Sequence, residues 1–245
     1  MESHMNVKIE EDDKDNKIYL KIATEYMDFI FPPIASQILE DTGINNGLCL
    51  DIGVGPGLLT VELAKQSNLK LVGIDISKIM IAYARSIVKK VGLENRIEIV
   101  EGDVHSLKYP NNYLDLVVSK DSLHYWKDPI SAFKEIYRVL KPGGMAYIMD
   151  LRRDAPEDIV NRFSEYLGDF FEHFQNTISR SYTIEEVFNI LDKTGILDYQ
   201  VRPFSMSDST IVNNITHLIK SPVKDPRASE LSLVVIIKKE DKNES

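Results

Sequence analysis

Cysteine is almost absent from this chain, which carries only Cys49 among its 245 residues. A single cysteine excludes an intramolecular disulfide framework and a cluster of cysteine metal ligands. Cys49 lies within an apolar stretch, so we expect it to be a small buried side chain of the core. We expect no metal site.

Long hydrophobic runs are also missing. The longest apolar stretches have the length of a β-strand, well short of the roughly 20 residues that cross a bilayer as a helix. No segment has the charged and apolar regions of a secretory signal. We therefore expect a cytoplasmic protein with no membrane partner.

Positive charge is scarce, with 29 Lys and Arg against 38 Asp and Glu and a formal net charge of −9. Nucleic acids and anionic membrane surfaces bind to basic proteins, so this balance argues against both as partners. Hydrophobic residues make up 43% of the chain, enough for the core of one α/β domain with extensions. The composition favours a small-molecule partner.

Among the features that the chain does contain, the most informative is the stretch from residue 48 to residue 58. Residues 48–52 are apolar apart from Asp51, Gly53, Gly55 and Gly57 follow at alternate positions, and a helical pattern begins at Leu58. Glycines in such a turn leave no side chain between backbone and ligand. The stretch predicts strand, tight turn and helix, with backbone N–H groups available to an anionic group.

The spacing of the glycines narrows the choice of ligand. A dinucleotide fingerprint needs glycine or alanine where this chain has Leu58, which disfavours an NAD-type dehydrogenase. The remaining pattern, Asp-x-Gly-x-Gly-x-Gly, resembles the first motif of class I S-adenosylmethionine (SAM) dependent methyltransferases. The alternative is a glycine-rich turn that only connects a strand to a helix.

Acidic residues also end the next two predicted strands, residues 70–75 and 96–103, at Asp75 and Asp103. The carboxyl ends of parallel strands are where such sheets bind ligands, and an acid about 20 residues beyond the glycines can accept hydrogen bonds from ribose hydroxyls. Asp75 has the alternative role of a helix cap, for which Ser77 competes. Asp103 has the alternative role of a turn residue after Gly102.

The resemblance implies a role for each of these residues. The three glycines would hold the methionine end of SAM, and Asp51 would order the turn or reach the amino group through water. Asp75 would bind the ribose, and the adjacent Ile76 would also contact the cofactor. Asp103 would accept from the adenine amine, while the backbone of Val104 contacts the ring.

The fourth predicted strand, residues 113–119, ends at Ser119. Ser119 begins a run that has the spacing Ser-x-x-x-Leu-His-x-Trp, with Leu123, His124 and Trp126, and this run resembles the same family. The resemblance implies that Ser119 lies beside the cofactor and Trp126 near the substrate. His124 is either a general base or a packing residue. The intervening pair, Lys120 and Asp121, either bond to each other or face a polar substrate.

Two segments outside these motifs are candidates for the substrate side. A helix is predicted over residues 18–31, stopped by Pro32 and Pro33, and residues 1–44 would form a helical lid or extension. Its Tyr19 would contact the cofactor and Tyr26 the substrate, unless both only pack on the sheet. A helical insertion at about 151–181 follows the fifth strand, and its Arg152 either clamps an anionic group or is simply solvated.

The alternation of strands and helices predicts a three-layer α/β domain over residues 45–240. The resemblance implies a doubly wound seven-stranded sheet with helices on both faces and the last strand antiparallel. It also implies SAM as methyl donor, S-adenosylhomocysteine (SAH) as product and a small-molecule acceptor. The alternative is a non-catalytic SAM- or nucleoside-binding protein, a sensor or an inactive partner subunit. Monomer and homodimer remain open.

Overall fold

A computed structural model describes residues 14–205 and 230–240, apart from the side chains of residues 14–16, 26, 164–166 and 169. Its centre is one seven-stranded sheet in the order β3-β2-β1-β4-β5-β7-β6. The strands are β1 (Asn46–Ile52), β2 (Asn68–Asp75), β3 (Ile97–Glu101), β4 (Leu114–Lys120), β5 (Leu140–Leu151), β6 (Tyr199–Pro203) and β7 (Ser232–Lys238).

The first five strands are parallel, and β7 runs antiparallel to both of its neighbours, β5 and β6. The strand order starts in the middle at β1, moves out to β3, and returns to β4 on the other side. The prediction of a doubly wound sheet with an antiparallel last strand is confirmed. This reversal at β1 and β4 creates the crevice in which sheets of this kind bind ligands.

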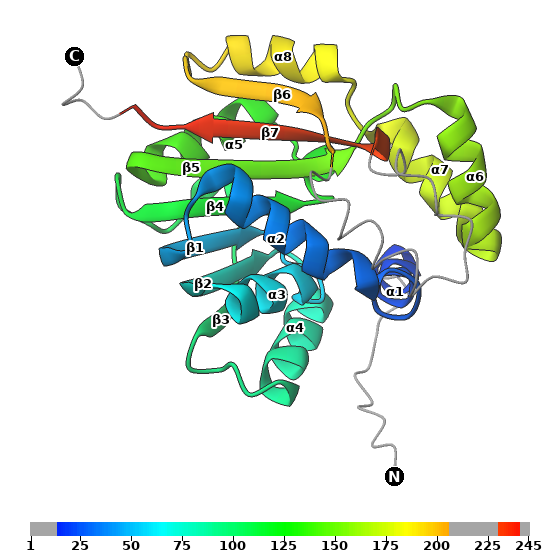
Figure 1. The fold of residues 1–245 in the computed structure, drawn as a ribbon, viewed down its shortest axis with the longest axis horizontal. Helices are drawn as coiled ribbons and strands as arrows, with labels where there is room; N and C mark the ends of the chain where they lie inside the picture. Colours follow the sequence, from blue (N-terminus) through cyan, green and yellow to red (C-terminus); the bar gives the residue numbers. More distant parts are fainter. Residues whose placement is uncertain (1–13, 206–229, 241–245) are drawn as a thin grey trace.

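Helices cover both faces of the sheet (Figure 1). The α-helices are α1 (Lys14–Lys21), α2 (Phe31–Thr42), α3 (Leu58–Gln66), α4 (Lys78–Lys90), α5 (Pro129–Val139), α6 (Glu157–Leu167), α7 (Phe171–Arg180) and α8 (Ile184–Asp192). Buried side chains of α2, α3 and α4 share one core with the sheet, and those of α5 and α8 share the other. The three-layer arrangement is therefore confirmed.

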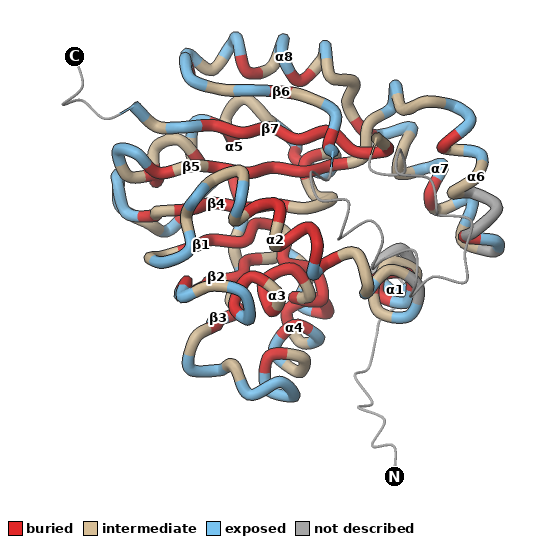
Figure 2. Tube along the Cα trace, viewed as in Figure 1, coloured by how far each residue is buried: buried red, intermediate tan, exposed pale blue. Residues whose placement is uncertain are grey.

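Alternation along the strands assigns each side chain to a layer. Cys49 packs with α2 and α3, whereas the next residue, Leu50, packs with α5. Because successive side chains of a strand point to opposite faces, both faces must be apolar in a sheet covered on both sides. Figure 2 shows the central strands as the most continuously buried part of the chain.

The N-terminal segment differs from the single helix predicted over residues 18–31. Helix α1 ends at Lys21, a π-helical turn occupies Ile22–Tyr26 and a 3-10 turn occupies Asp28–Ile30. Pro32 and Pro33 lie in the first turn of α2, where a missing backbone N–H costs no intrahelical hydrogen bond. The prolines therefore begin the next helix as well as end the preceding segment.

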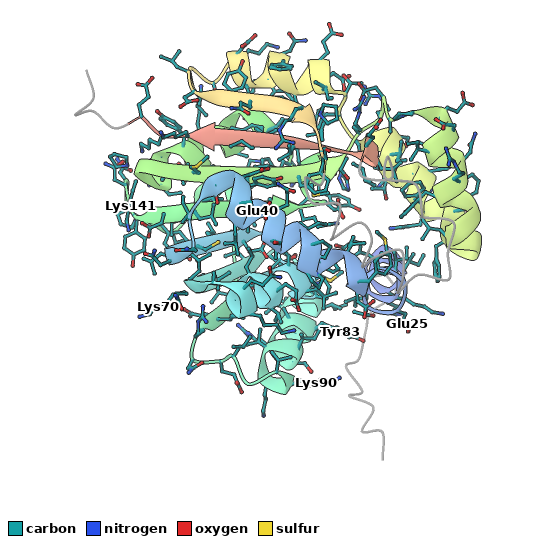
Figure 3. All side chains as sticks on the ribbon, viewed as in Figure 1. Glu25, Glu40, Lys70, Tyr83, Lys90 and Lys141 are labelled. Atoms are coloured by element: carbon teal, nitrogen blue, oxygen red, sulfur yellow. The ribbon has the colours of Figure 1, made fainter. Side chains whose placement is uncertain are left out.

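The N-terminal segment lies at the carboxyl ends of the parallel strands. In Figure 3, Lys70 and Lys141, near the starts of β2 and β5, lie at one edge of the molecule, and Glu25 lies toward the other. Ile22 packs in one apolar cluster with Ile159 of α6 and Phe174 of α7. The insertion and the N-terminal segment thus meet beside the ligand-binding edge of the sheet. No helix of the described residues is long and apolar enough to cross a membrane.

Replacing Phe133 by alanine tests how much the packing of α5 against Trp126 contributes to the stability of the fold. Phe133 of α5 is fully buried and packs edge-on against Trp126, with ring centroids 5.4 Å apart. We expect Phe133→Ala to lower the free energy of unfolding by about 3–5 kcal/mol because it leaves a cavity. Urea denaturation measures this, and Phe133→Leu, which keeps most of the volume, should lose much less. Equal losses in the two variants would contradict the packing argument.

Candidate cofactor and active site

A cavity of about 410 Å³ opens at the carboxyl ends of β1, β2, β3 and β4. Much of its wall comes from segments that the sequence singled out. Its lining residues are Tyr19, Ile52, Gly53, Gly55, Asp75, Ile76, Ser77, Met80, Gly102, Asp103, Val104, His105, Lys120, Asp121, Ser122, Tyr125, Trp126 and Lys127. Ten of the predicted site residues are in this set, and they come from five separate segments of the chain.

The glycine turn brings the backbone to the cavity. Gly53 has a φ of +68°, and a Cβ atom there would lie 2.5 Å from Cβ of Ser122. Side chains other than hydrogen are therefore excluded by both conformation and space. Gly55 lies beside the ring of Tyr19. Gly57 is the residue that precedes α3, packs against Ala84 of α4, and does not line the cavity.

Asp75 holds this turn in place. Its two oxygens accept hydrogen bonds from the backbone N–H groups of Gly55, at 3.0 Å, and Ser77, at 2.8 Å. Ser77 caps α4 by accepting from Met80 N–H, so Asp75 is not the cap. Burial raises the pKa of Asp75 although these hydrogen bonds oppose the change.

Asp103 has a hydrogen-bond partner, His105, that the sequence did not reveal. One of its oxygens lies 2.6 Å from Nδ1 of His105 and accepts from the backbone N–H of the same residue at 2.9 Å. These bonds, the backbone one first, hold the pKa of Asp103 below its usual value. Nearby, Val104 is buried while Ile76 is 73% exposed at the cavity rim.

Asp51 lies behind the glycine turn rather than in the main cavity. It is 2% exposed, and Oγ1 of Thr60 donates to one of its oxygens. Burial dominates and raises the pKa of Asp51 to about 7. A smaller hollow beside Asp51 is also lined by Tyr19, Phe31 and Lys120.

Tyr19 borders both the main cavity and this hollow. Burial raises the pKa of its phenol well above the usual value, and the charges of Asp121, Asp75 and Asp51 raise it further. The other tyrosine of the predicted lid, Tyr26, has a side chain outside the part of the chain that the structure describes.

The segment after β4 is tied to the glycine turn by hydroxyl groups. Oγ of Ser119 donates to the carbonyl of Ile52 at 2.9 Å and lies 2.7 Å from Oγ of Ser122. Nε1 of Trp126 donates to Oγ of Ser122 at 3.1 Å. Ser119 is buried and does not line the cavity, so the structure shows it in contact with the protein rather than with the cavity.

Lys120 and Asp121 bond to each other, which was one of the two predicted alternatives. Nζ of Lys120 contacts Oδ2 of Asp121 and also lies 5.4 Å from the ring centre of Phe31. Asp121 has a φ of +55°, unusual for a residue with a side chain. Its Oδ1 is buried and has no hydrogen-bond partner among the described residues.

His124 has a partner that sequence reasoning missed. Its Nδ1 lies 2.8 Å from Oδ1 of Asp150, the residue near the end of β5, and its backbone N–H donates to Oδ2. Burial disfavours the imidazolium, but the charge and hydrogen bond of Asp150 outweigh it and raise the pKa of His124. The ring is 1% exposed, and its Nε2 has no partner among the described residues.

Asp150 could have been found from the sequence by the argument that identified the other acids, because it also ends a parallel strand. His124 itself does not line the cavity. The centre of its ring lies 4.1 Å from that of Tyr125, and Tyr125 does line the cavity. Arg152 also lies away from the cavity, where it bonds to Asp154. No group of metal-binding side chains occurs among the described residues.

Comparison with protein families matches residues 50–148 to a methyltransferase domain. The chain is 31% identical over 137 residues to the uncharacterised methyltransferase YdaC of Bacillus subtilis, covering 54% of this chain and 74% of that protein. It is 40% identical over 167 residues to the chloroplastic 2-methyl-6-phytyl-1,4-hydroquinone methyltransferase of Spinacia oleracea, covering 67% of this chain but only 44% of the spinach protein.

Solved structures show the same fold over nearly the whole chain. A protein of Methanococcus maripaludis, described as a candidate SAM-dependent methyltransferase, is 31% identical with a TM-score of 0.71, covering 96% of this chain and 97% of that one. Phosphoethanolamine N-methyltransferase 2 of Haemonchus contortus, in complex with phosphomonomethylethanolamine and SAH, is 22% identical with a TM-score of 0.66. The match covers 93% of this chain and 58% of the nematode protein.

The raised pKa of Asp51 predicts a specific pH dependence of stability. The folded-state pKa of about 7 exceeds the ordinary value of 3.8, so the contribution of this group to stability is lost as pH rises through about 7. The loss can reach about 1.4 kcal/mol per pH unit between these values. We expect urea unfolding of Asp51→Asn to lack this loss, while Asp198→Asn, at an exposed position, keeps it. Parallel profiles for wild type and Asp51→Asn would contradict the assignment.

Proposed function

Because the chain belongs to the class I SAM-dependent methyltransferases, we propose that it transfers the methyl group of SAM to a small-molecule acceptor held in the cavity at the carboxyl ends of the strands. The observation that carries this proposal is the convergence of the glycine turn, Asp75 and Asp103 on that cavity. Its volume of about 410 Å³ is that of a small-molecule site.

The cavity residues fit the parts of the cofactor. In our proposal, the free capacity of the Asp75 carboxylate accepts from the ribose hydroxyls. Ile76 and Val104 provide apolar contacts for the adenine ring, and Oδ2 of Asp103 accepts from its amine, since Oδ1 is engaged by His105. The backbone of the glycine turn holds the methionine end.

Tyr19 links the N-terminal segment to this site. Its ring lies against Gly55 and borders the cavity. We assign to residues 14–44 the role of covering the cofactor, which excludes water from the reacting atoms. Water exclusion matters because it strengthens every electrostatic interaction within the site.

Bound SAM supplies a methyl carbon attached to a positively charged sulfur that is already a good leaving group. The protein therefore needs chiefly to align an acceptor with that carbon, and alignment alone can account for several kcal/mol of the barrier. Small-molecule acceptors are supported by the net charge of −9 and by the hydroquinone and phosphoethanolamine acceptors in the names of the similar proteins.

His124 does not line the cavity, but its ring lies against that of Tyr125, which does, and it is our candidate for the proton acceptor when the substrate must lose a proton. With Nδ1–H donated to Asp150, the imidazole keeps its lone pair on Nε2, which has no hydrogen-bond partner in the part of the chain that the structure describes. Asp150 also accepts from the backbone N–H of Leu151 at 2.7 Å, which fixes its orientation. Asp150 is accordingly a positioning residue that acts through His124.

The cofactor assignment predicts that Asp75→Asn weakens SAM binding by about 10- to 100-fold, because hydrogen bonds to a charged group are lost. Isothermal titration calorimetry measures the affinity, with thermal unfolding to verify the fold and Asp198→Asn as the matched control. The wild-type chain should release SAH from SAM when supplied with a suitable small molecule. Unchanged SAM affinity in Asp75→Asn, or binding of SAM without turnover across acceptor classes, would contradict the proposal.

The proton-acceptor assignment predicts that His124→Gln lowers kcat by about 10²- to 10⁴-fold with SAM affinity unchanged. Since the pKa of His124 is raised, kcat should rise with pH through a limb above 6.5. Asp150→Asn removes the cause of that shift, so the limb should move to lower pH. A pH profile unaffected by Asp150→Asn would show that the pair is only structural.

A further inference from the structure

Asp121 combines two unfavourable features at the edge of the cavity. Its backbone adopts a left-handed conformation with a φ of +55°, and Oδ1 is buried without a partner among the described residues. A buried carboxylate oxygen that accepts no hydrogen bond loses its hydration without compensation. Unfavourable features of this kind concentrate at functional sites.

The rest of Asp121 is held firmly. Oδ2 contacts Nζ of Lys120, and the backbone N–H donates to the carbonyl of Met149 on β5 at 2.9 Å. Oδ1 is thus the oxygen left for a ligand. Asp121 lines the cavity, and an ionised carboxylate can only accept hydrogen bonds, so the matching ligand group must be a donor.

The position of Asp121 separates it from the nucleoside end of the cavity. Asp75 and Asp103 lie at the ends of β2 and β3, whereas Asp121 follows β4 beside Tyr125 and Trp126. Its charge acts on His124, where it raises the pKa, as well as on Tyr19. Asp121 is therefore close to both the proposed lid tyrosine and the proposed proton acceptor.

The electrostatic balance of this region is negative. Among the described residues that line the cavity, the carboxylates of Asp75, Asp103 and Asp121 outnumber the ammonium groups of Lys120 and Lys127. An anionic acceptor such as a phenolate would be repelled here. A cationic donor gains both the hydrogen bond to Oδ1 and the favourable potential.

We propose that Asp121 is a specificity-determining residue that orients the nitrogen of an amine acceptor through Oδ1. This inference rests on the proposed function and narrows its substrate class to amines that arrive as ammonium ions. The apolar and aromatic groups beside Asp121, Tyr125 and Trp126, would contact the carbon atoms of the amine.

The proposed reaction balances without any further co-reactant. The ammonium form first loses one proton to the imidazole of His124, the proton acceptor of the proposed function, and the free amine attacks. The nitrogen lone pair forms the new C–N bond while the C–S bond breaks and its electrons remain on sulfur. Positive charge thus moves from sulfur to nitrogen, and a carboxylate beside that nitrogen stabilises the transition state. The products are a methylated ammonium ion and neutral SAH.

The test is binding of amines to the SAH-saturated full chain, measured by calorimetry. The probes are benzylamine, ethanolamine and further small primary and secondary amines, each paired with the alcohol that replaces its nitrogen by oxygen. We expect an amine to bind about tenfold or more tightly than its alcohol. Asp121→Asn should abolish that preference, and the amide tolerates the left-handed backbone. Asp198→Asn, the same change at an exposed site, should retain it.

Four results would overturn the proposal. The alcohols could bind as tightly as the amines, or none of the amines could bind. The preference for the amine could survive in Asp121→Asn, or that variant could bind SAH about tenfold more weakly. The last result would show that Asp121 holds the amino group of the cofactor instead. Failure of the proposed function would give a different result from failure of this inference. The chain would bind SAM and an amine, but no SAH would form from SAM in their presence.

Discussion

The pair of hydrogen bonds from Gly55 and Ser77 to the carboxylate of Asp75 is the constraint on which the site depends. The first joins the turn after β1 to the end of β2, and the second joins β2 to the start of α4. One half-buried side chain therefore fixes the position of the glycine turn and the start of a helix, and it also lines the cavity. Because burial of this charge is costly, the two N–H groups stabilise the carboxylate as much as it stabilises the turn.

The other side of the cavity is supported by hydrogen bonds that join the end of β1 to β4, to the segment after β4 and to β5. Ser119 and Ser122 bond to each other, and both reach the carbonyl of Ile52. His124 is joined to Asp150 through its ring and its backbone. These bonds hold the segment after β4 close to the glycine turn, where Gly53 has no room for a side chain. Rigid positioning of this kind suits a reaction whose barrier depends mainly on alignment.

Charge gives the cavity its chemical character. Among the described lining residues, carboxylates outnumber lysines, and burial together with neighbouring charge raises the pKa values of Asp51 and Tyr19. A methyl donor with a positive sulfur fits such a site. In our proposal, Oδ1 of Asp121, which has no hydrogen-bond partner among the described residues, extends this preference to the acceptor.

The sequence alone determined the α/β class, the strand that ends in the glycine turn, and the acids Asp51, Asp75 and Asp103, because apolar periodicity and glycine spacing are local properties. It did not determine that the prolines begin α2, that Asp51 lies behind the turn, or that Ser119 and Arg152 bond within the protein. The partnership of His124 with Asp150 was equally hidden, since 26 positions separate them. Only the sheet order, which places β4 beside β5, brings these two residues into contact. Contacts between distant segments arise from packing, and no local pattern encodes them.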